Sequence, residues 1–220
     1  MSNLGYDAAH LLGALVLMMS FALLYQRRLS ALLNAFTLQA LALAAAAAWQ
    51  GYAQHSHHLF ITAALTLVLK AVVMPVALRR IVAKLNIERT IEPALSIGLT
   101  MVAGVSLVTL SILLVMPVTE DATALTREDL ALSLSVVLLG LLMMISRRNA
   151  VSQVVGFMSI ENGLILAAIG VAGMPMIVEM SIAFSVMVAF IVFGIFLFHI
   201  RERFDTLDVH KIETFRGESQ

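Results

Sequence analysis

The sequence predicts an all-α membrane protein with about seven transmembrane helices, because of its composition, its apolar runs and the distribution of its basic residues. The chain has 220 residues, of which 60% are hydrophobic and 13% are charged, and its mean hydropathy is +0.96. Soluble domains are about half apolar and about a quarter charged, so this chain lacks the polar residues that would cover a soluble core. At about 20 residues per crossing, it is long enough for roughly seven spans.

The same composition excludes several classes of protein. Lysine plus arginine equals aspartate plus glutamate, at 14 each, so no basic excess is present to bind nucleic acid. The absence of cysteine excludes disulfides, iron–sulfur clusters and thiolate metal sites. The histidines at 55, 57 and 58 could bind a metal, but a polar loop explains them more simply. We therefore expect no metal site, no cofactor and no catalytic residue.

Seven apolar runs, separated by polar breaks, define the expected spans. They cover residues 4–25, 29–50, 58–82, 94–117, 129–146, 150–172 and 175–200.

Each break between the runs has a local cause. Arginine pairs form tight turns after the first and fifth runs, and the histidine-containing loop follows the second. A charged stretch follows the third run, an acidic loop over 117–129 follows the fourth, and a Gly–Pro turn follows the sixth. Pro75 lies inside the third run, where its missing N–H predicts a kink.

The basic residues also predict the orientation of the chain. If the runs cross the membrane alternately, twelve lysines and arginines fall on one side and only Arg127 falls on the other. Because basic loops stay in the cytoplasm, we expect the N-terminus outside and the C-terminus in the cytoplasm. This alternation requires seven spans and so supports the short fifth run. Residues 1–200 would form the transmembrane domain, and residues 201–220 a cytoplasmic tail.

A weak internal similarity suggests two related three-helix units, at about 4–82 and 129–200. The segment QALALAAA resembles ENGLILAA, which aligns Gln39 with Glu161.

Two ionisable residues lie near the middle of predicted spans. Lys70 is about 18 Å from either end of its helix, and placing a charge at such a depth costs about 2.5–3.5 kcal/mol on insertion scales. Glu161 lies at the same depth in the sixth run, beside Ser159, Asn162 and Gly163. Both side chains should be shielded from lipid, and Glu161 is the first candidate for a proton relay. A purely structural salt bridge is the alternative.

Glu179 is a weaker candidate, because it lies only about four residues into the seventh run. Ser185, near the middle of that run, is explained by packing.

Several motifs resemble the membrane component E family of hydrogenase-four complexes, which are energy-converting relatives of respiratory complex I. They are GFMSIENGLILAA, GMPMIVEMSIAF, DTLDV in the tail, LKAVVMPVALRR around the buried lysine, and the SRRN turn. The C-terminal three helices also resemble subunit K of complex I and the C component of Mrp-type sodium–proton antiporters.

The resemblance implies a non-catalytic, proton-conducting subunit in a bacterial inner membrane, with antiporter-like and redox subunits as partners. In it, Glu161 matches the family's buried glutamate, Lys70 a lysine before a proline, and Glu179 the glutamate after the Met–Pro turn. One position departs: Ser185 stands where relatives can carry an aspartate. Two alternatives stay open, a free-standing ion or small-molecule carrier and a structural spacer.

Overall fold

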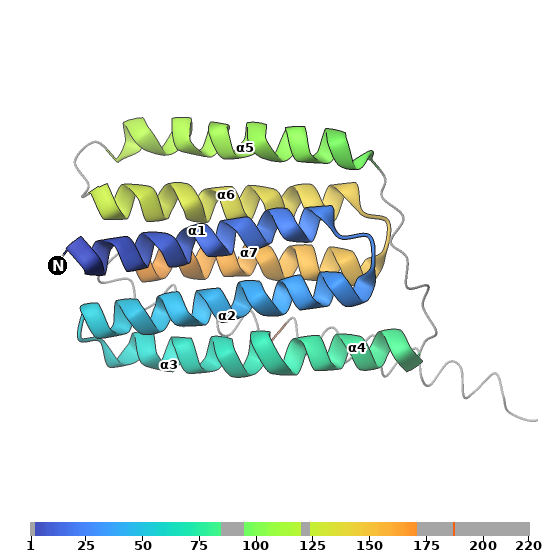
Figure 1. Ribbon diagram of the computed structural model, residues 1–220, viewed down its shortest axis with the longest axis horizontal. Helices are drawn as coiled ribbons and strands as arrows, with labels where there is room; N and C mark the ends of the chain where they lie inside the picture. Colours follow the sequence, from blue (N-terminus) through green and yellow to red (C-terminus); the bar gives the residue numbers. More distant parts are fainter. Residues whose placement is uncertain (1–2, 85–94, 120–123, 171–186, 188–220) are drawn as a thin grey trace, which may run out of the picture. The chain divides into compact units, whose positions relative to one another are not determined.

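The chain folds into long, roughly antiparallel helices (Figure 1). The computed structural model describes residues 3–84, 95–119, 124–170 and 187. It divides into two units, residues 1–183 and 184–220, and the helices of the bundle all belong to the first unit. The predicted seventh span, Glu179, Ser185 and the tail lie outside the described residues.

The described elements are all helical, so the all-α prediction is confirmed. They are α1 (Asn3–Tyr25), α2 (Leu29–Ala53), α3 (His57–Leu65), the π-helix η1 (Thr66–Val73), α4 (Met74–Lys84), α5 (Ile97–Val118), α6 (Ala124–Ser146) and α7 (Ala150–Gly170).

Six stretches of these helices are long and apolar enough to cross a membrane, with α3, η1 and α4 forming one of them. The chain is therefore a multi-pass membrane protein. Large apolar side chains face outward on α5, including Val102 at 65% and Leu113 at 62% exposure, as lipid contact requires.

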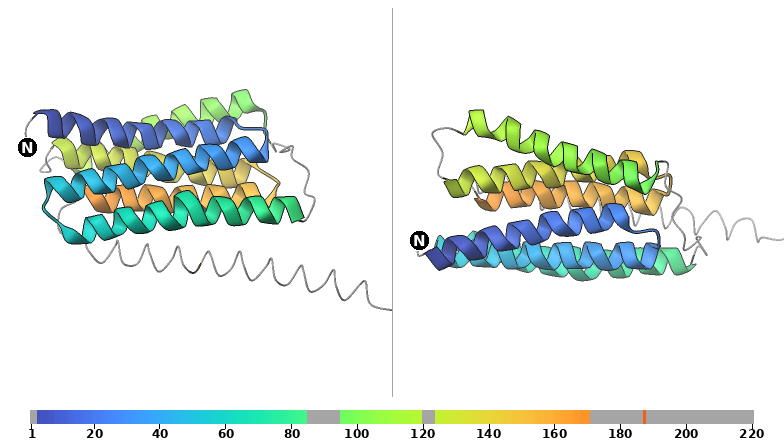
Figure 2. Two further views of the ribbon diagram at one scale, coloured as in Figure 1. Left: turned by 60° about the horizontal axis from the view of Figure 1, so that its bottom comes forward. Right: turned by 45° about the horizontal axis from the view of Figure 1, so that its top comes forward.

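The helices form two facing layers (Figure 2). One layer holds α1, α2 and the α3–η1–α4 helix, and α6 and α7 pack across it through contacts of α1 with α6 and of α2 with α7. Among the larger contacts between described helices, those of α5 are with α6 and α1. The α1–α2 and α6–α7 turns lie at the same end of the bundle (Figure 1). We call it the basic end, because these turns carry Arg27, Arg28, Arg147 and Arg148.

Helices α6 and α7 make the most extensive contact in the bundle, because glycines let their backbones meet. A Cβ atom built on Gly140 would lie 2.9 Å from the carbonyl oxygen of Gly156, and one on Gly163 would lie 2.9 Å from that of Ser133. Small residues at such positions allow close helix packing in membranes. This contact fixes α7 in the middle of the bundle, where its polar residues are buried.

One predicted boundary is wrong. Helix α6 begins at Ala124, not at Asp129, so the predicted acidic loop is shorter. Neighbouring helices bind or cover the charged residues at the start of α6, and a hydropathy profile does not detect such contacts. Arg127 donates to the carbonyl oxygen of Thr119 at the end of α5, Glu128 pairs with His10 of α1 at 3.0 Å, and Asp129 is buried.

Candidate functional site

Lys70 and Glu161 meet in the interior of the bundle. Lys70 lies on η1 and Glu161 on α7, and the Nζ atom of the lysine is 3.0 Å from Oε2 of the glutamate. Their side chains are 2% and 1% exposed. The prediction that both are shielded from lipid is confirmed, and the structure brings together two residues that the sequence placed only at a common depth.

The lysine stands on an irregular stretch of helix. From Thr66 to Val73 the backbone is π-helical, and the N–H of Met74 donates to the carbonyl oxygen of Leu69, five residues earlier. Pro75 follows directly and cannot donate to Ala71, the residue four positions before it. The expected effect of the proline therefore takes the form of a widened turn that includes Lys70. Single π turns occur often at functional sites.

Asn162 connects the ion pair to a second polar group. Its Oδ1 atom accepts a hydrogen bond from Lys70 Nζ at 3.0 Å, and its Nδ2 atom donates to Oε1 of Gln39 at 3.0 Å. The Nε2 atom of Gln39 then donates to the hydroxyls of Ser20 at 2.8 Å and Ser159 at 2.9 Å. All of these side chains are buried.

Six residues from α1, α2, η1 and α7 thus form one continuous set of interactions, which we call the polar network: Ser20, Gln39, Lys70, Ser159, Glu161 and Asn162. Sequence reasoning found the charged pair and noted Ser159 and Asn162 beside it. It did not assign a role to Ser20 or Gln39. The available signal was the amide of Gln39 near the middle of a leucine- and alanine-rich helix, at the position that aligns with Glu161.

The geometry suits proton transfer. The lysine and glutamate side chains are in direct hydrogen-bonding contact, so a proton can pass between Nζ and the carboxylate without a mediator. When the carboxylate is neutral, Asn162 still supplies Lys70 with an acceptor. An ion pair in a low-dielectric interior is often no more stable than apolar residues of similar size. The stability that the Lys70–Glu161 pair gives to the fold therefore does not by itself account for the presence of the pair.

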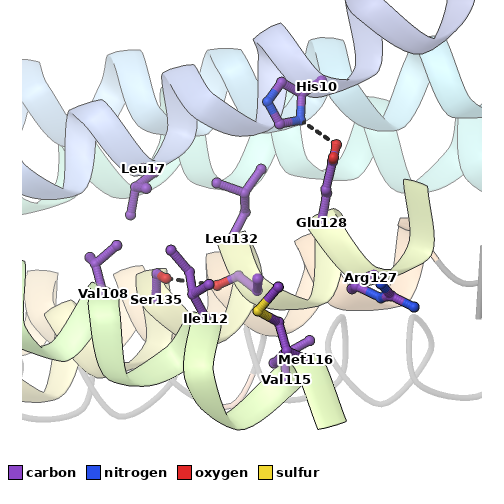
Figure 3. Close-up of a pocket in the computed structure, with 11 residues that line it drawn as sticks. His10, Leu17, Val108, Ile112, Val115, Met116, Arg127, Glu128, Leu132 and Ser135 are labelled. Carbon is purple, nitrogen blue, oxygen red and sulfur yellow. Dashed lines mark hydrogen bonds and ion pairs between the residues drawn. The ribbon is translucent and has the colours of Figure 1, made fainter. Parts of the chain in front are cut away.

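A separate cavity of about 380 Å³ lies between α1, α5 and α6 (Figure 3). Its walls are mainly apolar, with Leu17, Ile112 and Leu132 among them, and the half-exposed His10–Glu128 pair stands at its rim. It is not lined by the polar network. In the described part of the chain, no group of three or more His, Cys, Asp or Glu side chains is placed to hold a metal ion.

Arg147 lies in the turn between α6 and α7, but its side chain is buried. It is only 3% exposed, and its Nη2 atom donates to the carbonyl oxygen of Leu24 at the end of α1. Burial lowers the pKa of its guanidinium, and the nearby Arg27 lowers it further. The carbonyl groups in the last turn of a helix lack helical donors, and Arg147 satisfies one of them.

Comparison with known proteins finds a relative that matches nearly the whole chain. The uncharacterized protein Rv0085 of Mycobacterium tuberculosis is 30% identical over 206 residues, which cover 93% of each chain. Hydrogenase-4 component E of Escherichia coli is 32% identical over 136 residues, or 60% of this chain and 62% of that protein, and its Shigella flexneri counterpart matches equally. No family model and no solved structure matches.

Proposed function

We propose that this chain, which belongs to the family of the Mycobacterium tuberculosis protein Rv0085, is a membrane subunit of a hydrogenase-like, energy-converting complex and helps to translocate protons or sodium ions. The distant relationship to hydrogenase-4 component E supports membership of such a complex. The bacterial inner membrane would be its location, with antiporter-like and redox subunits as partners. The likeness of the C-terminal helices to subunit K of complex I and to the C component of Mrp antiporters belongs to the same proposal.

The buried Lys70–Glu161 pair carries the proposal. In its working cycle, Glu161 accepts a proton and later releases it, while Lys70 supplies the compensating charge or passes on its own proton. The 3.0 Å contact, the burial of both groups and the second acceptor on Asn162 support this role. Glu179 remains a weaker third member of the relay. The complex itself carries out the redox chemistry, and this chain binds no redox centre.

Substitution of Glu161 tests the relay. Glu161→Gln retains the volume and much of the hydrogen bonding but removes the titratable proton. We expect the complex to assemble and to transfer electrons to an artificial acceptor, while coupled pumping in reconstituted vesicles falls to a small fraction. Glu161→Asp should be milder, because the acid is kept. The matched control is Glu128→Gln, which alters a half-exposed carboxylate of another ion pair and should leave pumping unchanged.

A structural role would give a different pattern. If the pair only holds helices together, Glu161→Gln should first lower the amount of assembled complex, and any complex that forms should pump normally. A free-standing carrier would be recognised by purification in mild detergent with a tag on the C-terminal tail. The chain would then appear alone or as a homo-oligomer, and antiporter-like or redox subunits would be missing.

A further inference from the structure

The polar network lies near mid-depth of the bundle, and we infer that Glu161 and Lys70 exchange protons with the basic end of the bundle, along the interface of α1, α2 and α7. This inference rests on the proposed function of the ion pair and adds the side from which the pair is reached.

The hydrogen bonds of the network lead toward the basic end. From Lys70 they pass through Asn162 to Gln39, and from Gln39 to Ser20 and Ser159. Ser20 lies five residues before the end of α1, at the basic end. Ser159 lies two residues nearer that end of α7 than Glu161, or about 3 Å along the helix axis.

A hydrophobic cluster occupies much of the half of the interior that is remote from the basic end, alongside buried polar residues such as Gln50 and Ser133. We call it the apolar cluster, and its buried members are Val16, Leu43, Ala46, Ala47, Leu59, Ala63, Val136, Ile165, Leu166 and Ile169. On each of α1, α2, α3 and α7, these residues lie on the side of the network that is remote from the basic end.

Two buried hydroxyls also lie in that half, on the same helix as Lys70. Thr62 and Thr66 precede the lysine by eight and four residues. The hydroxyl of Thr62 donates to the carbonyl oxygen of His58, within its own helix. Within the described residues, the Thr62 hydroxyl has no hydrogen bond to a neighbouring helix. Apolar side chains are also buried on the basic side, among them Leu32, Phe36 and Met158. Within the described residues, the two sides therefore differ in which buried polar groups lack a partner, not in how much apolar packing they contain.

Toward the basic end, buried polar groups continue beyond the network. Ser152 of α7 is 0% exposed, and within the described residues its hydroxyl has no hydrogen-bond partner. The Nη1 atom of Arg147 is likewise buried and lacks a partner there. Polar groups buried without a protein partner are usually satisfied by water. These two groups therefore mark a place where water can enter from the basic end.

One interval must be crossed between this place and the network. Ser152 and Ser159 are seven residues apart, which is about 10 Å along α7. The fully buried side chain of Val155 lies in that interval, and Gly156 there packs against α6. Protons would cross it on transiently admitted water.

Thiol accessibility tests the inference without any measurement of pumping, because the chain has no cysteine of its own. Cysteine would be introduced singly at Ser152, Ser159, Ala47 and Thr66, in the assembled complex in membrane vesicles. A small, charged methanethiosulfonate would be applied from each face in turn. Arg148→Cys and His57→Cys, both at exposed positions, would report which face is the basic end and which is the opposite end.

We expect Ser152→Cys and Ser159→Cys to react from the face at which Arg148→Cys reacts. Their rates should exceed that of Ala47→Cys at least about tenfold, since a thiol in a closed apolar cluster reacts only when the helices open locally. The inference is overturned if both react as slowly as Ala47→Cys, or if Thr66→Cys is the reactive position and responds from the His57 side. Loss of pumping in Glu161→Gln combined with unreactive serine positions would reject this route while leaving the relay intact.

Discussion

Removing Lys70 alone should be far more damaging than removing the whole ion pair. In Lys70→Met, the apolar chain keeps most of the volume, but Glu161 Oε2 and Asn162 Oδ1 lose the donor that now lies 3.0 Å from each. Because Met offers no donor, a buried charge is left uncompensated, which costs about 3–5 kcal/mol. For a chain of this size, each kcal/mol lowers the melting temperature by about 2–4 °C, which gives a loss of about 6–20 °C. Glu161→Gln costs less, since its amide oxygen still accepts from Lys70.

The double variant Lys70→Met/Glu161→Leu provides the decisive comparison. With both charges gone, the free energy of unfolding should return to within about 2 kcal/mol of the native value, since apolar residues can replace buried ion pairs at little cost. Thermal unfolding of the purified chain in one detergent would measure all variants. Glu128→Gln serves as control and should cost about 1 kcal/mol or less, because its pair is half exposed. A Lys70→Met protein as stable as the native chain would refute the reasoning.

Two further predictions concern packing and the amide chain. Gly140→Ala should lower the free energy of unfolding by about 1–3 kcal/mol, since the added Cβ would lie 2.9 Å from the backbone oxygen of Gly156. In the control, Gly98→Ala, the added Cβ meets nothing within 4 Å and should not lower it. Equal melting temperatures for the two variants would contradict the packing argument. Gln39→Leu should cost about 1–3 kcal/mol, because the Nδ2 atom of Asn162 loses its acceptor. If the amide also positions Lys70, the same variant should shift the pH profile of pumping, a change that a purely structural amide would not produce.

The spans could be predicted because each consists of an apolar run of about 20 residues, a requirement set by the bilayer alone. The same reasoning located Lys70 and Glu161, since a charge in the middle of such a run is costly wherever its partner lies. Hydropathy failed at the start of α6. There it treated Arg127, Glu128 and Asp129 as loop residues, although neighbouring helices supply their partners or cover them.

The polar network could not be predicted in the same way. A hydrogen bond between Gln39 of α2 and Asn162 of α7 depends on which helices are neighbours and on how each is rotated. Both properties follow from the glycine contacts between α6 and α7 and from the packing of α2 against α7, and neither leaves a periodic signal in a leucine- and alanine-rich sequence. The chemical properties of these residues could therefore be taken from the sequence, whereas the hydrogen bonds that connect them could not be predicted from it.

The π-helical stretch has a consequence for how this region tolerates change in length. A π turn holds more residues than an α turn, so it acts as an insertion absorbed within a continuous helix. Deleting one residue between Thr66 and Val73 would therefore let this stretch close into α-helix, while the helix on either side keeps its orientation. Each residue of an α-helix turns the chain by about 100°, so the same deletion beyond Val73 would instead turn Arg79, whose Nη2 atom donates to Asn34 Oδ1 at 2.6 Å, away from α2. The helix should thus tolerate a change in length within its π-helical stretch better than between that stretch and the contact near the basic end.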